Sequence, residues 1–179
     1  MDSPAPSPPR PALFLDRDGT LTHDEGYTFK VENLRWLPGA REAIAAANAH
    51  GVPVVLITNQ SGIGRGYFTE ADMHAFHAAM SSDLAALGAR IDAIYFCPFI
   101  KDAASPRYDH PDHPDRKPNP GMLLRAIADL GLDPGRSLMV GDQASDLEAA
   151  QRAGIPAIRA DGSDLLGLIA GWLAAVRGS

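Results

Sequence analysis

The sequence alternates short apolar runs with longer segments that have the composition of helices, and this alternation limits the fold more than any other feature. The apolar runs cover residues 12–15, 52–57, 91–96, 137–140 and, more weakly, 155–158. The segments predicted to be helical cover residues 39–50, 69–87, 119–130, 143–153 and 164–176. Strands that alternate with helices predict an α/β fold, and strands that are apolar throughout are typical of a parallel sheet covered on both faces. We therefore predict a central parallel sheet of about five strands, flanked by helices.

Several helix ends can be predicted from capping residues. Gly51 follows the first helix, as a C′ glycine does. Thr69 and Asp72 have the spacing of a capping box at the start of the second helix. Asn119 and Pro120 are suited to the N-cap and N1 positions of the third.

Composition excludes several classes of protein. The chain has 179 residues, a length that suits one domain, and we expect residues 12–179 to form it after a disordered Pro- and Ser-rich tail at residues 1–11. The formal net charge of −6 argues against nucleic acid as a partner. No apolar run approaches the roughly 20 residues that a membrane span needs. A single cysteine excludes an internal disulfide, and together these features predict a cytoplasmic protein.

Polar side chains follow the predicted strands at the points where the strands end. These side chains are Asp16 and Asp18; Thr58, Asn59 and Gln60; Lys117; and Asp142 and Asp146. The carboxyl ends of parallel strands meet at one edge of a sheet, which is where such folds bind ligands. Three carboxylates in one small site need a compensating cation, and oxygen ligands without His or Cys favour Mg²⁺.

The order of these motifs resembles that of a known family. D-x-D-G-T at residues 16–20, Thr-Asn at 58–59, Lys117, and G-D-x-x-x-D at 141–146 are similar to the four motifs of the haloacid dehalogenase superfamily of phosphohydrolases. The resemblance covers residues 12–159. It implies a Rossmann-like fold and a phosphatase that works through an aspartyl-phosphate.

The resemblance also implies roles for individual residues. Asp16 is expected to be the nucleophile, and Asp18 the general acid and then the general base. Residues i and i+2 of a strand point the same way, so both carboxylates reach one phosphoryl group while Arg17 points elsewhere. Mg²⁺ would be held by Asp16, Asp142 and the backbone carbonyl of Asp18.

Three further side chains complete the expected site. Thr58 would donate a hydrogen bond from its hydroxyl to a phosphoryl oxygen. Lys117 would neutralise the negative charge on the oxygens of the phosphoryl group during its transfer. Asp146 lies four residues after Asp142, on the same face of one predicted helix. It is expected to orient Lys117 or a metal-bound water.

The lengths of the loops predict a phosphatase without a cap domain. Members of the superfamily differ in inserted caps, but residues 17–38 are too few for one, and helix 69–87 is unbroken. The substrate must then be selected by loops.

Three strings point to one branch of the superfamily. Residues 58–68, Cys97-Pro98 and residues 116–122 resemble the corresponding loops of D-glycero-D-manno-heptose-1,7-bisphosphate 7-phosphatases. Histidinol-phosphate phosphatases share the arginine after the nucleophile, but Arg65 favours the heptose branch. Arg65 and Arg116 could grip the second phosphate of a sugar bisphosphate, and Asn59 and Gln60 are further candidates for substrate contact.

Other functions remain open at this point. The first alternative is a phosphatase for histidinol phosphate or another small metabolite. A nucleic-acid 3′-phosphatase is disfavoured by the negative charge. A catalytically silent binding module would be expected to lose Asp16, Asp18 or Asp142, and a metal-binding structural protein would rest on the His- and Asp-containing loop alone. The expected partner is a small phosphorylated substrate, and the family resemblance favours a monomer.

One loop departs from the heptose branch, whose members carry a zinc knuckle of Cys-x-His and Cys-x-Cys. Cys97 keeps the first ligand, but Phe99 replaces the histidine, and His113 and Asp115 replace the later cysteines. Cys97, His110, His113 and Asp115 are a conceivable substitute set. Structural zinc prefers Cys and His ligands, so we favour a loop that has lost zinc and is held by proline stiffness, aromatic packing and polar contacts.

Overall fold

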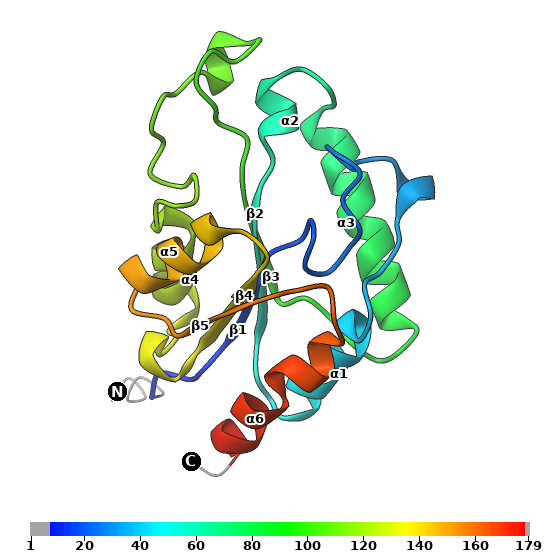
Figure 1. The fold of residues 1–179 in the computed structure, drawn as a ribbon, viewed down its shortest axis with the longest axis vertical. Helices are drawn as coiled ribbons and strands as arrows, with labels where there is room; N and C mark the ends of the chain where they lie inside the picture. The colour runs from blue at the N-terminus through cyan, green and yellow to red at the C-terminus, as the bar shows by residue number, and fades with distance from the viewer. Residues whose placement is uncertain (1–7, 178–179) are drawn as a thin grey trace, which may run out of the picture.

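A five-stranded parallel sheet forms the centre of the molecule, in a computed structural model that describes residues 8–177 (Figure 1). The strands are β1 (Leu13–Leu15), β2 (Val54–Asn59), β3 (Ala93–Cys97), β4 (Leu138–Gly141) and β5 (Ala157–Arg159). Their order in the sheet is β3-β2-β1-β4-β5, and every neighbouring pair is parallel. The predicted α/β, Rossmann-like fold with five strands is confirmed.

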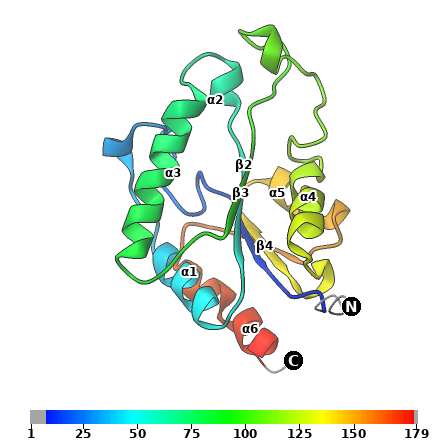
Figure 2. The same ribbon diagram turned by 180° about the vertical axis from the view of Figure 1, so that it is seen from behind.

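Helices cover both faces of this sheet. They are α1 (Ala40–Ala49), α2 (Ser61–Gly64), α3 (Glu70–Ala85), α4 (Gly121–Leu130), α5 (Ala144–Arg152) and α6 (Leu165–Arg177). Helices α4 and α5 lie on one side of the sheet, and α1, α3 and α6 lie on the other, as the two opposite views show (Figures 1 and 2). Short 3₁₀ helices at Val31–Asn33, Pro106–Tyr108 and Pro134–Arg136 lie in the connections.

The central strand, β1, is apolar at every position because both of its faces are buried. Leu13 and Leu15 belong to the core cluster that includes Ile44, Phe76 and α6 residues. Phe14 belongs to the other cluster, with α4 and α5. Successive side chains of a strand point to opposite faces, and here both faces are buried.

The helix ends test the predicted caps. At α3, the Thr69 hydroxyl accepts from the Asp72 amide at 3.1 Å, and the Asp72 carboxylate accepts from the Thr69 amide at 2.8 Å, so the capping box is confirmed. The prediction for α4 is wrong, because this helix begins at Gly121 with Pro120 at the N-cap. The Asn119 side chain donates to Asp112 and to a backbone carbonyl of the preceding loop instead.

The two long connections contain little regular structure. Between β1 and α1, and again between β3 and α4, the described chain forms a single three-residue 3₁₀ helix and isolated β-bridges. The predicted tail at residues 1–11 lies mostly outside the described residues, but Arg10 forms a parallel bridge with Leu132. Across residues 8–177, no helix is both long and apolar enough to cross a membrane.

Candidate active site

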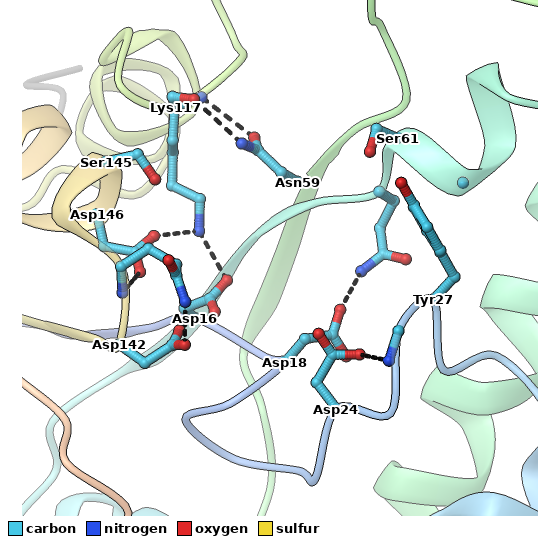
Figure 3. Close-up of a pocket in the computed structure, with 14 residues that line it drawn as sticks. Asp16, Asp18, Asp24, Tyr27, Asn59, Ser61, Lys117, Asp142, Ser145 and Asp146 are labelled. Atoms are coloured by element: carbon cyan, nitrogen blue, oxygen red, sulfur yellow. Dashed lines mark hydrogen bonds and ion pairs between the residues drawn. The ribbon is translucent and has the colours of Figure 1, made fainter.

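A polar cavity lies at the carboxyl ends of β1, β2 and β4, where the sheet order changes direction (Figure 3). It is lined by Asp16, Asp18, Asp24, Gly26, Tyr27, Asn59, Gln60, Ser61, Gly62, Lys117, Asp142, Gln143, Ser145 and Asp146. Seven of the residues predicted from the sequence therefore line a single cavity: Asp16, Asp18, Asn59, Gln60, Lys117, Asp142 and Asp146.

Lys117 lies between two carboxylates. Its Nζ is 2.7 Å from Asp16 Oδ1 and 2.6 Å from Asp146 Oδ1, and it donates to the Ile57 carbonyl at 2.9 Å. Burial favours the neutral amine, but the two carboxylates outweigh it and raise the pKa of Lys117 above its usual value. The site thus holds a buried, charged lysine against the predicted nucleophile.

Asn59 fixes the backbone that carries this lysine. Its side-chain amide donates to the Lys117 carbonyl, and its side-chain oxygen accepts from the Lys117 amide, both at 3.1 Å. Both ends of the Asn59 side chain are therefore engaged within the protein, although the residue also lines the cavity.

Burial disfavours the ionised forms of both aspartates of the first motif. It raises the pKa of Asp16 to about 7, with Lys117 opposing the shift and Asp146 and Asp18 adding to it. Burial also raises the pKa of Asp18, while Arg17 and Gln60 oppose the shift. A cation beside Asp16 would favour the anion that a nucleophile needs.

Arg17 is fully buried, and it makes contacts with the site that the sequence did not suggest. The expectation that it points away from the site is only half right, because its guanidinium lies outside the cavity lining but folds back onto Asp18. Its Nε is 2.8 Å from Asp18 Oδ1, and its Nη2 is 2.9 Å from Asp18 Oδ2. The same group donates to the Thr28 carbonyl and to Gln60 Oε1, contacts His77 Nε2 at 3.2 Å, and lies over the Phe76 ring. The bidentate pair fixes the orientation of the Asp18 carboxylate.

Gln60 and Thr58 continue this network. The side-chain amide of Gln60 donates from Nε2 to Asp18 Oδ2 at 2.9 Å and to the Thr58 hydroxyl at 2.8 Å. Thr58 is fully buried beneath Gln60 and is not among the residues that line the cavity. Its expected contact with a phosphoryl oxygen stays a prediction.

Three carboxylates are close enough to share one cation. Ligand atoms of Asp16, Asp142 and Asp146 all lie within 4.8 Å of one another. Asp142 Oδ1 is buried and has no hydrogen-bond partner within the described residues. Asp142 precedes α5 and is not on the helix face predicted for it, because α5 begins at Ala144 after a capping box between Gln143 and Asp146. An unpaired buried oxygen in an all-oxygen set fits a hard divalent cation such as Mg²⁺.

The two predicted phosphate-binding arginines do not line the cavity. Arg65 is exposed just after α2. The guanidinium of Arg116 donates to the Phe99 carbonyl at 3.1 Å and so braces the loop between β3 and α4. Sequence spacing placed both residues near the site but could not give the direction of their side chains.

The substitute zinc set is not assembled. In the described part of the chain, Asp16, Asp142 and Asp146 form the one group of three or more His, Cys, Asp or Glu side chains that meets metal-site spacing. The ring of His113 stacks on Phe99 with centroids 3.8 Å apart, and Asp115 is 3.0 Å from Arg125. Cys97 is fully buried, and burial raises the pKa of its thiol to about 11. These residues do not fit a structural zinc ion.

Comparison with known proteins agrees with this geometry. The family model for haloacid dehalogenase-like hydrolases matches residues 25–154. The chain is 46% identical to the D-glycero-beta-D-manno-heptose-1,7-bisphosphate 7-phosphatase of Rhodopseudomonas palustris, over 90% of this chain and 89% of that protein. It is also 46% identical to the D-glycero-alpha-D-manno-heptose-1,7-bisphosphate 7-phosphatase of Burkholderia mallei, over 80% of this chain and 76% of that protein.

Solved structures agree as well. A HAD-like phosphatase of Mesorhizobium loti has a TM-score of 0.84 at 38% identity. The match covers 99% of this chain and 91% of that protein's chain. The D,D-heptose 1,7-bisphosphate phosphatase of B. bronchiseptica, complexed with magnesium and phosphate, has a TM-score of 0.73 at 35% identity, over 82% of this chain and 78% of its own. The resemblance predicted from the motifs is confirmed: the chain belongs to the haloacid dehalogenase-like hydrolases.

Proposed function

We propose that this chain is a Mg²⁺-dependent phosphatase that removes the 7-phosphate of D-glycero-D-manno-heptose 1,7-bisphosphate. The observation that carries the proposal is the cluster of Asp16, Asp142 and Asp146, in which the carboxylates of Asp16 and Asp146 both pair with Lys117 and Asp142 has an unpaired buried oxygen. Asp16, Asp142 and the Asp18 carbonyl would hold the ion. When bound, the ion would neutralise charge between nucleophile and phosphate.

The residues supply the two steps of the reaction. A carboxylate oxygen of Asp16 attacks phosphorus, the bond from phosphorus to the sugar oxygen breaks, and Asp18 donates a proton to that oxygen. A water molecule then attacks phosphorus of the aspartyl-phosphate, and Asp18 takes a proton from that water. The bond from phosphorus to the Asp16 oxygen breaks, so inorganic phosphate leaves and the Asp16 carboxylate is regenerated. Lys117 stabilises negative charge throughout. Arg17 and Gln60 hold Asp18 in place, and Asp146 holds Lys117.

The names of the relatives support the substrate. Relatives from several organisms, 41–46% identical to this chain, are heptose 1,7-bisphosphate 7-phosphatases. Their names differ in the anomer, beta for most of these relatives and alpha for that of Burkholderia mallei, so both anomers are candidate substrates. Arg65 and Arg116 stay proposed contacts for the remote phosphate, and Thr58 stays a proposed contact for the transferred one. Asn59 and Gln60 stay proposed contacts for the substrate. We further propose that the enzyme is monomeric and cytoplasmic and that it binds no zinc.

The proposal is tested by phosphate release from a panel of substrates. The panel contains both anomers of heptose 1,7-bisphosphate, histidinol phosphate and the heptose 1-phosphate, each assayed with Mg²⁺ and with excess EDTA. We expect the highest kcat/KM on one bisphosphate anomer, release of a single phosphate, and loss of activity in EDTA. A preference for histidinol phosphate would contradict the proposed substrate. Activity that persists in EDTA would contradict the proposed dependence on Mg²⁺.

A further inference from the structure

One polar side chain is buried on the inner face of α3, which is otherwise apolar. The residues that this helix buries are Met73, Phe76, His77, Met80 and Leu84. Four of these five described residues are apolar, and the exception, His77, is only 4% exposed. Polar groups are seldom buried without a partner, so the reason for this histidine lies in its contacts.

His77 forms a hydrogen bond with Arg17. The distance from Arg17 Nη1 to His77 Nε2 is 3.2 Å. A guanidinium nitrogen can only donate, so Nε2 is the acceptor and the ring proton is on Nδ1. Nδ1 is buried and has no hydrogen-bond partner among the described residues. A leucine or phenylalanine would avoid the cost of this unpaired donor, so the bond to Arg17 is what a histidine adds at this position.

This bond requires a neutral imidazole. A proton on Nε2 would remove the acceptor and place two cations 3.2 Å apart. Burial, together with the charges of Arg17 and His74, lowers the pKa of His77 to about 3. The acceptor is therefore present throughout the neutral pH range.

Two neighbouring residues of α3 hold the guanidinium group of Arg17. The Phe76 ring packs against the face of this group, with its centroid 4.8 Å from Cζ, and His77 accepts from Nη1. The Nε and Nη2 atoms of the same group pair with the carboxylate of Asp18. A planar group that is held at its face and at Nη1 has little freedom to rotate. The helix therefore sets the orientation of the arginine and, through it, that of the Asp18 carboxylate.

His77 reaches the site without entering the catalytic cavity. Neither His77 nor Arg17 is among the residues that line it. Helix α3 lies on the face of the sheet opposite α5, which carries Asp146, the partner of Lys117 (Figures 1 and 2). The two cations, Lys117 and Arg17, are thus anchored from opposite faces of the sheet.

We propose that His77 is a positioning residue for the general acid, and that it acts through Arg17 as a hydrogen-bond acceptor. The inference rests on the proposed phosphatase function and deepens it, because it extends the catalytic network to α3. His77 touches neither the cavity nor the carboxylate of Asp18, so its effect should be confined to the steps in which Asp18 transfers a proton.

The test compares variants of His77 that keep or remove the acceptor. His77→Leu and His77→Phe have no acceptor and suit an apolar helix face, and the phenylalanine also keeps a planar ring. His77→Gln keeps an oxygen that can accept from Arg17. His74→Leu is the matched control, because His74 is an exposed histidine of the same helix. Thermal unfolding of each variant shows whether it is folded.

The two substrates differ in whether the leaving oxygen needs a proton. Cleavage of heptose 1,7-bisphosphate releases an alcohol, whose oxygen takes a proton from Asp18. Cleavage of acetyl phosphate releases acetate, which leaves as a stable anion without that proton. Both reactions form the same aspartyl-phosphate, and its later hydrolysis does not enter kcat/KM, so this constant isolates the step in which the leaving group departs.

For the bisphosphate, we expect His77→Leu and His77→Phe to lower kcat/KM by about tenfold, through kcat and with KM within about twofold of wild type. For acetyl phosphate, kcat/KM should change by less than about twofold in the same variants. His77→Gln and His74→Leu should stay within about threefold of wild type on both substrates.

The possible outcomes separate this inference from the proposed function. Equal losses of kcat/KM on both substrates would show that His77 has a structural role and would overturn the inference. Unchanged kinetics of His77→Leu and His77→Phe on the bisphosphate would overturn it as well, and so would a His77→Gln variant as impaired as His77→Leu. A wild-type enzyme that hydrolyses neither substrate would overturn the proposed function itself.

Discussion

At the scale of single residues, the site depends on buried cations that pair with buried acids. Lys117 and Arg17 are both buried, and each contacts an aspartate of the D-x-D motif. A buried ion pair gains little net stability over apolar residues, but removal of one partner leaves a buried charge without compensation. We therefore read these pairs as features kept for catalysis.

Lys117→Met tests the first pair. Because Asp16 and Asp146 would then face each other without a cation, we expect the metal-free protein to lose about 3 kcal/mol of unfolding free energy at pH 8, and kcat/KM to fall by at least about 100-fold. Urea denaturation and phosphate release measure the two effects. Lys101→Met, an exposed lysine in the same loop, is the matched control. Similar stability and activity in both variants would contradict the assigned role.

Arg17→Lys tests the second pair. A lysine cannot reproduce the bidentate contact with Asp18 together with the contacts to Thr28 and Gln60, although it keeps the charge. We expect kcat to fall by about tenfold or more, with a smaller change in KM, since the orientation of the general acid is affected. A variant with wild-type kcat would show that Asp18 does not depend on this arginine.

At the scale of secondary structure, α3 carries a histidine with an unusual environment. His77 is buried, its Nε2 accepts from Arg17, and its Nδ1 has no partner among the described residues. Burial, followed by the Arg17 charge and that of His74, lowers the pKa of His77 to about 3. The folded protein thus keeps His77 neutral at a pH where the unfolded chain takes up a proton.

The sign of the pH effect follows from this difference. Between about pH 6.5 and pH 3 the unfolded state binds more protons at this residue, so stability falls as pH falls, by up to about 1.4 kcal/mol for each pH unit. In His77→Gln the amide oxygen can still accept from Arg17, but nothing titrates. We expect the stability difference between wild type and this variant to shift by about 2 kcal/mol from pH 7.5 to pH 5, in favour of the variant. Urea denaturation that gives the same difference at both pH values would refute the buried neutral state.

The secondary structure also shows what local sequence could predict. The strands and the α3 capping box depend on residues within a few positions of one another, and they were predicted from the sequence. The start of α4 was missed because Asn119 bonds Asp112, in the preceding loop, instead of its own helix. Likewise, the motif spacing identified which residues meet in the site, whereas the direction of Arg17, Arg65 and Arg116 depends on tertiary packing that spacing does not contain.

At the scale of the whole molecule, loops at the carboxyl edge of the sheet supply much of the cavity lining. The loop after β1 brings Tyr27 to the cavity, and the connection from β3 to α4 brings Lys117. The second connection is braced by the stack of Phe99 on His113 and by the ion pairs Arg125–Asp115 and Arg107–Glu70. Protein contacts therefore brace this loop, at the place where the sequence resemblance implies a zinc knuckle in the heptose branch.

Metal analysis tests that difference. For protein purified without added zinc, we expect no stoichiometric zinc, and we expect a zinc chelator to leave the melting temperature unchanged. Addition of Mg²⁺ should raise the melting temperature with concentration in wild type and much less in Asp142→Asn, which lacks one carboxylate of the cluster. One tightly held zinc ion per chain, lost to the chelator together with stability, would contradict the account of the loop.

The central claim is that Asp16 is the nucleophile of a phosphatase, and the most direct measurement is phosphate release by Asp16→Asn with Mg²⁺ and heptose 1,7-bisphosphate. The matched control is Asp129→Asn, which changes an exposed aspartate of α4 that does not line the cavity. We predict that Asp16→Asn folds but loses at least about a thousandfold in kcat, while Asp129→Asn keeps wild-type activity. Turnover by Asp16→Asn at the wild-type rate would contradict the account.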